Sequence, residues 1–186
     1  MSSSLTLFLR FSVILVAFLV SSPSVRAGQE KPEGDAPVRF IWGAEIGPGI
    51  DMGGDDMSTL NLGAMMGLRC PYLSVAGIGA GINMMISNSC RYFPVYAIAR
   101  SSFSRNPRLF FMEMRAGIAF NQAVGIPDRT NLYLQPGGGI HLATGKTFAS
   151  YLMLSYVYNS MTFYGDRNNS LVHGLNQATI TLGVTF

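Results

Sequence analysis

The feature that most constrains the fold of this chain is an alternation of apolar and polar residues that repeats every second position. It is clearest at the C-terminus, where the apolar positions are Ala178, Ile180, Leu182, Val184 and Phe186, with threonine and glycine between them. Successive side chains of a β-strand point to opposite faces of a sheet. The alternation therefore predicts a strand with one apolar face and one polar face.

Eight segments of this kind follow one another after residue 38, with turn-forming residues between them. The predicted strands are 39–50, 58–69, 73–86, 92–103, 109–120, 132–142, 148–159 and 175–186. Each is at least eleven residues long, whereas strands of globular proteins most often have about 5–6 residues. A strand that crosses a lipid bilayer at a tilt needs about 9–11 residues, so these lengths favour a transmembrane sheet.

The chemistry of the two faces separates a membrane barrel from a soluble one. A soluble barrel that binds a lipophilic ligand has a water-facing surface rich in Lys and Glu. Here the polar face consists mostly of Gly, Ser, Thr, Asn and Tyr, and only 12% of the residues are charged, against about 25% in soluble proteins. A membrane barrel turns its apolar face to lipid and its polar face to the lumen. The sequence predicts an all-β fold, an eight-stranded antiparallel up-and-down transmembrane β-barrel.

The first 38 residues lie outside this pattern. Residues 1–27 are typical of a secretory signal peptide, with an apolar stretch at Phe11–Val20 and small residues at the cleavage site that ends with Ala27. Residues 28–38 are polar and contain two prolines, so we expect a flexible leader before a barrel over 39–186. The formal net charge of +3 provides no basic patch of the kind that binds nucleic acid.

Connection lengths predict an orientation. If both ends of the barrel domain lie on the periplasmic side, short turns fall inside and longer loops outside, which is the usual asymmetry of bacterial barrels. The expected inner turns lie near 70–72, 104–108 and 144–147, and the expected outer loops are 51–57, 87–91, 121–131 and 160–174.

The signal peptide, the eight alternating segments and the closing ATITLGVTF resemble the small outer-membrane β-barrels of the OmpX type and the transmembrane domain of OmpA. The resemblance covers about residues 39–186. It implies a location in the outer membrane of a Gram-negative cell after cleavage near Ala27. It also implies that the terminal aromatic residue, Phe186, is the assembly signal that the barrel-insertion machinery recognises.

Four charged residues have the register of the lumen face: Glu45, Arg69, Glu113 and Arg115. The alternation over 92–103 does not set an orientation, so we orient this strand by placing Arg100 on its polar face. Because an unpaired buried charge is costly, we expect a lumen network of Glu45 and Glu113 with Arg100 and Arg115, and we expect Arg69 at the periplasmic rim. The network could be a gate or a packed polar plug. Eight-stranded barrels have interiors just wide enough for side chains, which favours the plug.

The predicted outer loop over 160–174 mixes aromatic and charged residues. Phe163, Tyr164, Asp166 and Arg167 are our candidate contacts for a partner outside the cell, since loops on rigid scaffolds often carry function.

Enzymatic activity is the next alternative, because a few barrels of this family modify lipid A. The deacylase type resembles a His-x-Ser pattern with an acidic partner, but here the sequence is His141-Leu142-Ala143. No group of residues meets the geometric requirements of a catalytic site, so no catalytic residue is predicted.

The two cysteines flank the third predicted strand. A disulfide needs Cα atoms within about 7 Å, so we expect no bond between Cys70 and Cys90. Two cysteines and two scattered histidines have no metal-binding spacing, and we expect neither a metal nor a cofactor.

These observations together predict a monomeric, non-enzymatic outer-membrane barrel with a filled lumen and an envelope structural or surface-interaction role. Its expected partners are outer-membrane lipid, the insertion machinery and a possible surface partner. The alternatives are a lipid A-modifying enzyme, a soluble lipophile-binding barrel and an accessory component of a secretion machine.

Overall fold

The computed structural model describes residues 38–54, 57–69, 73–87, 90–102, 110–122, 130–145, 147–164 and 171–186. The side chains of 163, 164, 171 and 172 are not described. The predicted signal peptide and almost all of the predicted leader lie outside the described residues. Within the described part of the chain, no helix is long and apolar enough to cross a membrane.

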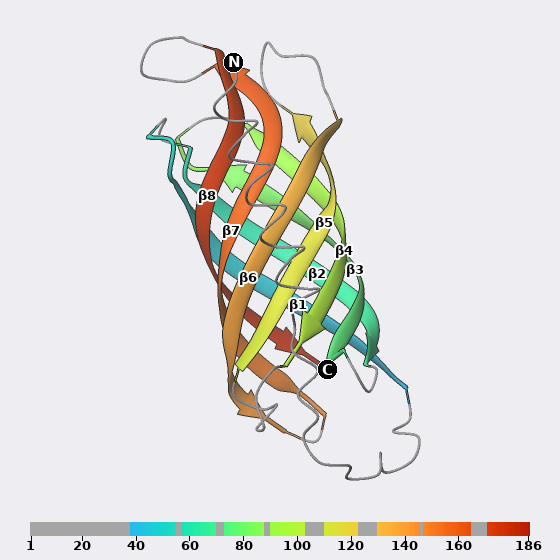
Figure 1. Cartoon of the computed structure of the whole chain (residues 1–186). Helices are drawn as coiled ribbons and strands as arrows, with labels where there is room; N and C mark the ends of the chain where they lie inside the picture. The colour runs from blue at the N-terminus through green and yellow to red at the C-terminus, as the bar shows by residue number, and fades with distance from the viewer. Residues whose placement is uncertain are drawn as a thin grey trace, which may run out of the picture. The chain divides into compact units, whose positions relative to one another are not determined.

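Eight antiparallel strands form one closed barrel in which each strand pairs with its sequence neighbours and the last pairs with the first (Figure 1). The strands are β1 (Arg39–Asp51), β2 (Thr59–Arg69), β3 (Val75–Met85), β4 (Arg91–Ser101), β5 (Phe110–Gln122), β6 (Thr130–Thr144), β7 (Ala149–Tyr164) and β8 (Leu171–Thr185). The predicted fold class and number of strands are confirmed.

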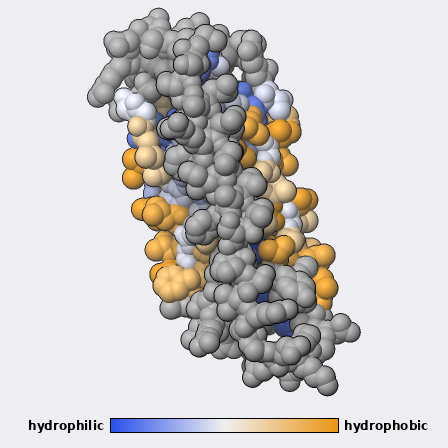
Figure 2. Space-filling model, viewed as in Figure 1, coloured by the Kyte–Doolittle hydropathy of each residue, from blue (hydrophilic) through white to orange (hydrophobic). Residues whose placement is uncertain are grey.

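The alternation in the sequence separates the inside from the outside of the barrel. In β8, Thr179 and Thr181 are buried, whereas Ile180 and Leu182 are exposed. Large apolar side chains are exposed on every one of the eight strands. Figure 2 shows such side chains along both visible flanks of the barrel. The core is therefore the lumen, and the outer wall is apolar.

The closing seam of the barrel joins the two ends of the domain. Trp42 and Phe186 exchange backbone hydrogen bonds, with N···O distances of 3.2 and 2.8 Å. Their rings stack on the outer wall with centroids 4.7 Å apart. The last residue of the chain therefore belongs to the β1–β8 ladder. We call the end of the barrel where β1 begins and β8 finishes the proximal end, and the other the distal end.

Two register shifts interrupt the ladders. The first inserts Leu142 of β6 between the pairs His141–Tyr151 and Ala143–Ser150. The second sets two residues of β7, Ser160 and Met161, against one residue of β8. That residue is Gly174, whose φ of 88° is left-handed and favours glycine.

The predicted loop over 160–174 is wrong, because β7 continues to Tyr164 and β8 begins at Leu171. Phe163 and Tyr164 pair through their backbones with Val172 and Leu171, so they extend a hairpin instead of forming a loop. The other two candidate contacts, Asp166 and Arg167, lie outside the described residues.

The predicted asymmetry of connection lengths is also wrong. The longest connection, 102–109, has eight residues and lies at the proximal end, where short turns were expected. The four distal connections have five to seven residues. Each connection lies at the end where the prediction placed it, and the shortest, 145–148, is proximal as expected. Connection length alone therefore gives no orientation for this barrel.

Candidate lumen site

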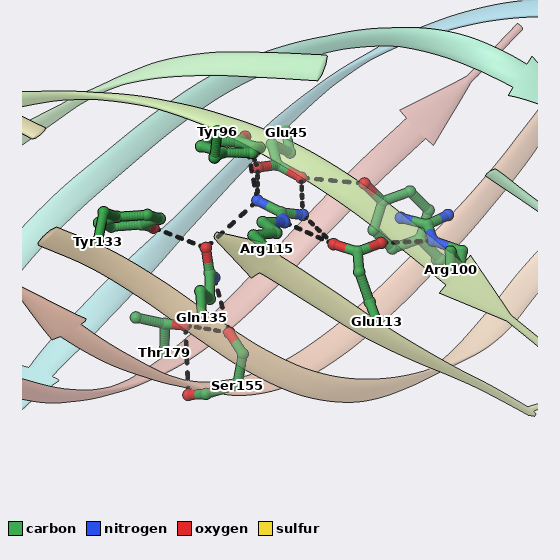
Figure 3. A network of polar contacts seen from close by, with 10 residues as sticks. Glu45, Tyr96, Arg100, Glu113, Arg115, Tyr133, Gln135, Ser155 and Thr179 are labelled. Atoms are coloured by element: carbon green, nitrogen blue, oxygen red, sulfur yellow. Dashed lines mark hydrogen bonds and ion pairs between the residues drawn. The ribbon is translucent and has the colours of Figure 1, made fainter. Parts of the chain in front are cut away.

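The structure brings together the four charged residues that we expected in the lumen network. Glu45 comes from β1, Arg100 from β4, and Glu113 and Arg115 from β5. Glu113 and Arg115 share one face because they are two positions apart in a strand. Figure 3 shows the four side chains meeting inside the barrel.

Glu113 bridges the two arginines. Its Oε2 accepts from Arg100 Nε at 2.5 Å, and its Oε1 accepts from Arg115 Nε at 2.5 Å. The side chains of all three residues are at most 2% exposed. Because each charge is removed from water, each depends on its partner for compensation.

Glu45 holds the other side of Arg115. Arg115 Nη2 donates to Glu45 Oε2 at 2.7 Å, and Arg115 Nη1 also donates to Glu45 Oε1. Two tyrosine hydroxyls also donate hydrogen bonds to the Glu45 carboxylate, Tyr151 at 3.0 Å and Tyr96 at 3.3 Å. The fork of Arg115 thus binds both glutamates, and the two cations and two anions of the cluster balance.

Aromatic rings flank both guanidinium groups. Arg100 Cζ lies 4.4 Å from the centroid of the Phe111 ring and 4.1 Å from that of Tyr151. Arg115 Cζ lies 5.1 Å from the centroid of Tyr96. Cations over ring faces are attracted at these distances, so the rings fix the arginines as well as fill the lumen.

Two glycines make room for these rings. A Cβ atom at Gly79 would collide with the ring of Tyr96, and one at Gly183 would collide with the ring of Tyr151. Both glycines have the lumen register of their strands. The lumen therefore combines large and small side chains from facing strands.

A chain of neutral polar groups continues from Arg115 across the lumen. Gln135 accepts from Tyr133 at 2.6 Å and donates to Ser155 at 2.8 Å. The Ser155 hydroxyl lies 2.5 Å from that of Thr179. Sequence reasoning did not single out these residues, although each has the lumen register that identified the charged four.

A second polar group lies nearer the distal end. Gln177 accepts from Tyr92 at 3.2 Å and from Thr59 at 3.3 Å, and donates to the carbonyl of Met57 at 2.7 Å. Met57, which lies just before β2, is 1% exposed and covers this part of the lumen.

The cavity that the described residues enclose beside the charged network is small. One cavity of about 20 Å³, open to the centres of water-sized molecules, lies beside Glu45 and Arg115 and reaches Asn61, Asn83 and Thr181. That is room for about one water molecule. The side chains beside this cavity include the buried ion pairs of the charged network.

The remaining candidate residues lie apart from this cluster. Arg69 is exposed at the last position of β2, and Phe186 lies at the seam. The His141 ring is tilted against Phe111 and lies edge-on to Tyr151, with ring centroids 5.0 and 6.5 Å away. The other histidine, His173, approaches the Thr162 hydroxyl at 3.2 Å in the distal hairpin.

Cys90 is a buried free thiol between β3 and β4. Burial raises the pKa of this thiol. Cys70 lies outside the described residues. Among the described residues, no three His, Cys, Asp or Glu side chains are grouped so that they could hold a metal ion.

No protein-family model matches the chain, and no curated protein matches its sequence. Seven solved chains are similar in structure. Neisserial surface protein A has a TM-score of 0.52 and 16% identity, covering 80% of this chain and 97% of that one. A de novo designed transmembrane β-barrel has a TM-score of 0.49 and 16% identity, over 78% and 93%.

Ail, the attachment invasion locus protein of Yersinia pestis, solved with the heparin analogue sucrose octasulfate, has a TM-score of 0.37 and 13% identity, over 80% and 97%. Identities this low concern the fold alone. The similarity to Neisserial surface protein A, together with the eight-stranded closure, shows the fold of the small outer-membrane β-barrels.

Proposed function

We propose that this chain is a non-enzymatic outer-membrane β-barrel protein with a side-chain-filled lumen, acting as a structural or surface-interaction component of the cell envelope. The observation that carries the proposal is the apolar outer wall of a closed barrel. On β3 and β7, Ile78 is 60% exposed and Leu154 is 63% exposed.

An apolar wall of this extent is costly in water and favourable in lipid. Exposed apolar patches on soluble proteins mark contacts or promote aggregation, whereas a bilayer solvates them. A closed barrel pairs every strand edge, as a spanning sheet requires. Exposed Trp42, Phe148 and Tyr156 suit the aromatic girdles of such barrels.

The contents of the lumen argue against the soluble lipophile carrier. Such a carrier needs an apolar interior with space for its ligand. Here buried ion pairs of Arg100, Glu113 and Arg115 occupy the interior, and the cavity beside them has room for about one water. An ionic and filled lumen supports a mechanical role for the network in place of ligand carriage.

The surroundings of His141 support a non-enzymatic role. Its ring contacts are Phe111 and Tyr151, and neither is an activated nucleophile or an orienting carboxylate of the kind that a histidine base requires.

In the same proposal, residues 1–27 direct export and are removed near Ala27, and Phe186 serves as the assembly signal for the insertion machinery.

The distal end is the proposed outer face, and the barrel is monomeric. The β7–β8 hairpin projects at this end beyond the bulge at Gly174, so it is the best-placed element for contact with a partner outside the cell. Tyr164 belongs to this hairpin, and residues 165–170 join its two strands.

Fractionation and heat-modifiability of the native protein test the proposal. Outer-membrane fractions of the expressing cell are run on denaturing gels with and without boiling. The proposal expects the protein in these fractions, with a faster band before boiling. Recovery in the periplasm without detergent, with no change in mobility, would contradict it.

The orientation is tested separately. A short epitope is inserted after Asn168, and in a matched control after Lys146. The epitope after Asn168 should bind antibody on intact cells, and the one after Lys146 only after permeabilisation. The reverse pattern would overturn the assignment of the distal end to the outside.

A further inference from the structure

Two arginines face each other at the proximal mouth of the lumen. Arg39 and Arg69 lie directly opposite each other in the β1–β2 ladder. Like charges facing each other across strands are destabilising, and neither forms a salt bridge with any of the residues that the structure describes. Both have the lumen register and are exposed.

Two buried polar atoms near this mouth have no hydrogen-bond partner within the described chain. They are Nη2 of Arg100 and Nδ1 of His141. Arg100 is 1% exposed, and its Nε is already committed to Glu113. A buried donor without a partner costs about 1–3 kcal/mol, so each such atom calls for an explanation.

The same groups converge. Phe111 touches both Arg100 and His141, with 4.4 Å to the guanidinium carbon and 5.0 Å between ring centroids. Tyr151 also lies near both, with 4.1 Å from its ring centroid to the guanidinium carbon of Arg100 and 6.5 Å to the ring centroid of His141. The bulge at Leu142 follows directly, and bulges often set the direction of a neighbouring side chain at functional sites.

The acidic residues of the lumen do not supply the missing partner. Glu113 is shared by Arg100 and Arg115, and Glu45 is bound by Arg115 and two tyrosines. The sequence of the proximal connections, 70–74, 102–109 and 145–148, contains no Asp or Glu. Among the described residues, no carboxylate forms an ion pair with Arg39 or Arg69, and none reaches Nη2 of Arg100.

We propose that the proximal mouth is a binding site for an oxyanion of the phosphate class, either free or as a lipid headgroup. Arg100 Nη2 and His141 Nδ1 donate to the anion from the buried side. A neutral imidazole can donate through either nitrogen, so no protonation is required. Arg69 and Arg39 attract the anion from the exposed side. This site rests on the barrel alone and not on the proposed cellular role.

Histidine-selective NMR of the full folded protein in zwitterionic detergent tests the site. The chain has two histidines, and His173 lies in the distal hairpin, so it serves as an internal control. Inorganic phosphate is titrated at constant pH against sodium chloride of equal ionic strength. We expect a saturable shift of the His141 ring signals with phosphate, no such shift with chloride, and no movement of His173.

Variants identify the groups that bind. Arg69→Gln alters an exposed side chain and should weaken the apparent affinity about tenfold without changing the heat-modifiable mobility. Arg91→Gln, a matched exposed arginine at the distal end, should bind like the parent. Equal affinity in both variants would overturn the site.

A second titration, with lipid, distinguishes a free anion from a lipid headgroup. Mixed micelles that contain phosphatidylglycerol are compared with micelles that contain phosphatidylcholine at equal lipid content. A shift of His141 with inorganic phosphate supports the site, and a shift with phosphatidylglycerol alone supports it with a lipid headgroup as the ligand. No saturable shift with either, or parallel shifts of His141 and His173, would contradict it.

Discussion

At the residue scale, Arg115 joins the two halves of the charged network. Its guanidinium contacts Glu45 on β1 and Glu113 on its own strand, and it also faces Tyr96 on β4. Because β1 and β5 are not neighbours in the sheet, this side chain links opposite walls of the barrel. The network therefore stabilises the barrel across the lumen as well as along each ladder.

Glu113→Gln should destabilise the barrel strongly. The substitution keeps the shape but removes the charge that two buried arginines share, and breaking a buried pair costs about 3–5 kcal/mol. Denaturant unfolding in micelles, followed by fluorescence of the single Trp, measures the change in free energy. Arg91→Gln, at an exposed position, is the control and should change it by less than about 0.5 kcal/mol.

Cys90 should resist alkylation while the barrel is folded. Alkylation requires the thiolate, and burial raises the pKa of this thiol, so less thiolate forms at a given pH. In a Cys70→Ser background, maleimide at pH 8 should modify Cys90 at least tenfold more slowly in the folded than in the unfolded protein. Mass spectrometry follows the reaction, and equal rates would show that the thiol is accessible.

The charged residues of the lumen could be predicted because register and charge are both visible in the sequence. Glu45 and Arg115 are far apart in the chain, yet each follows the polar face of its strand. The rings beside them could not be predicted in the same way. Tyr151 has the lumen register, but its contact with Arg100 depends on the space that Gly183 leaves on the neighbouring strand, and a single strand contains no information about that pairing.

At the element scale, the last three strands differ most from the prediction. The stretch from Ser160 to Gly174 contains Gly, Asn and Asp residues that favour turns. Backbone pairing with the partner strand prevails over this local preference out to Tyr164 and Leu171. The bulge opposite Gly174 also changes the register between the two strands, so simple alternation could not extend the hairpin.

Gly174→Ala should weaken the distal hairpin. A Cβ at this position would find its nearest neighbour at 3.4 Å, which is ordinary contact, so the cost comes from the φ of 88° and should be about 1–2 kcal/mol. Hydrogen exchange should increase at Thr162 and His173 and stay unchanged in β2.

Gly138→Ala is the matched control for this hairpin variant. Its nearest neighbour would lie at 3.6 Å, and Gly138 is not among the described glycines with positive φ. Its exchange profile should resemble that of the parent. Similar profiles in Gly174→Ala and Gly138→Ala would contradict the role assigned to the bulge.

At the scale of the whole molecule, each strand has one lumen face and one outer face. One set of alternate residues forms an ionic, hydrogen-bonded lumen, and the other forms an apolar wall. The fold class followed from this alternation because it repeats in all eight strands, so local errors in strand ends did not change the architecture. The orientation of the barrel in the membrane did not follow from the sequence, because connection lengths depend on where the strands of each hairpin end.

If the wall faces lipid and the lumen side chains do not, substitutions at two adjacent residues of β8 should differ sharply in effect. Leu182 is 47% exposed on the wall, whereas Thr181 is 5% exposed and lines the lumen cavity. Leu182→Arg should reduce the assembled, heat-modifiable protein in membranes, since arginine near the midplane costs about 2–4 kcal/mol. Thr181→Asn should assemble like the parent, because its amide can use the cavity. Equal tolerance of both substitutions, or a greater loss with Thr181→Asn, would contradict the account.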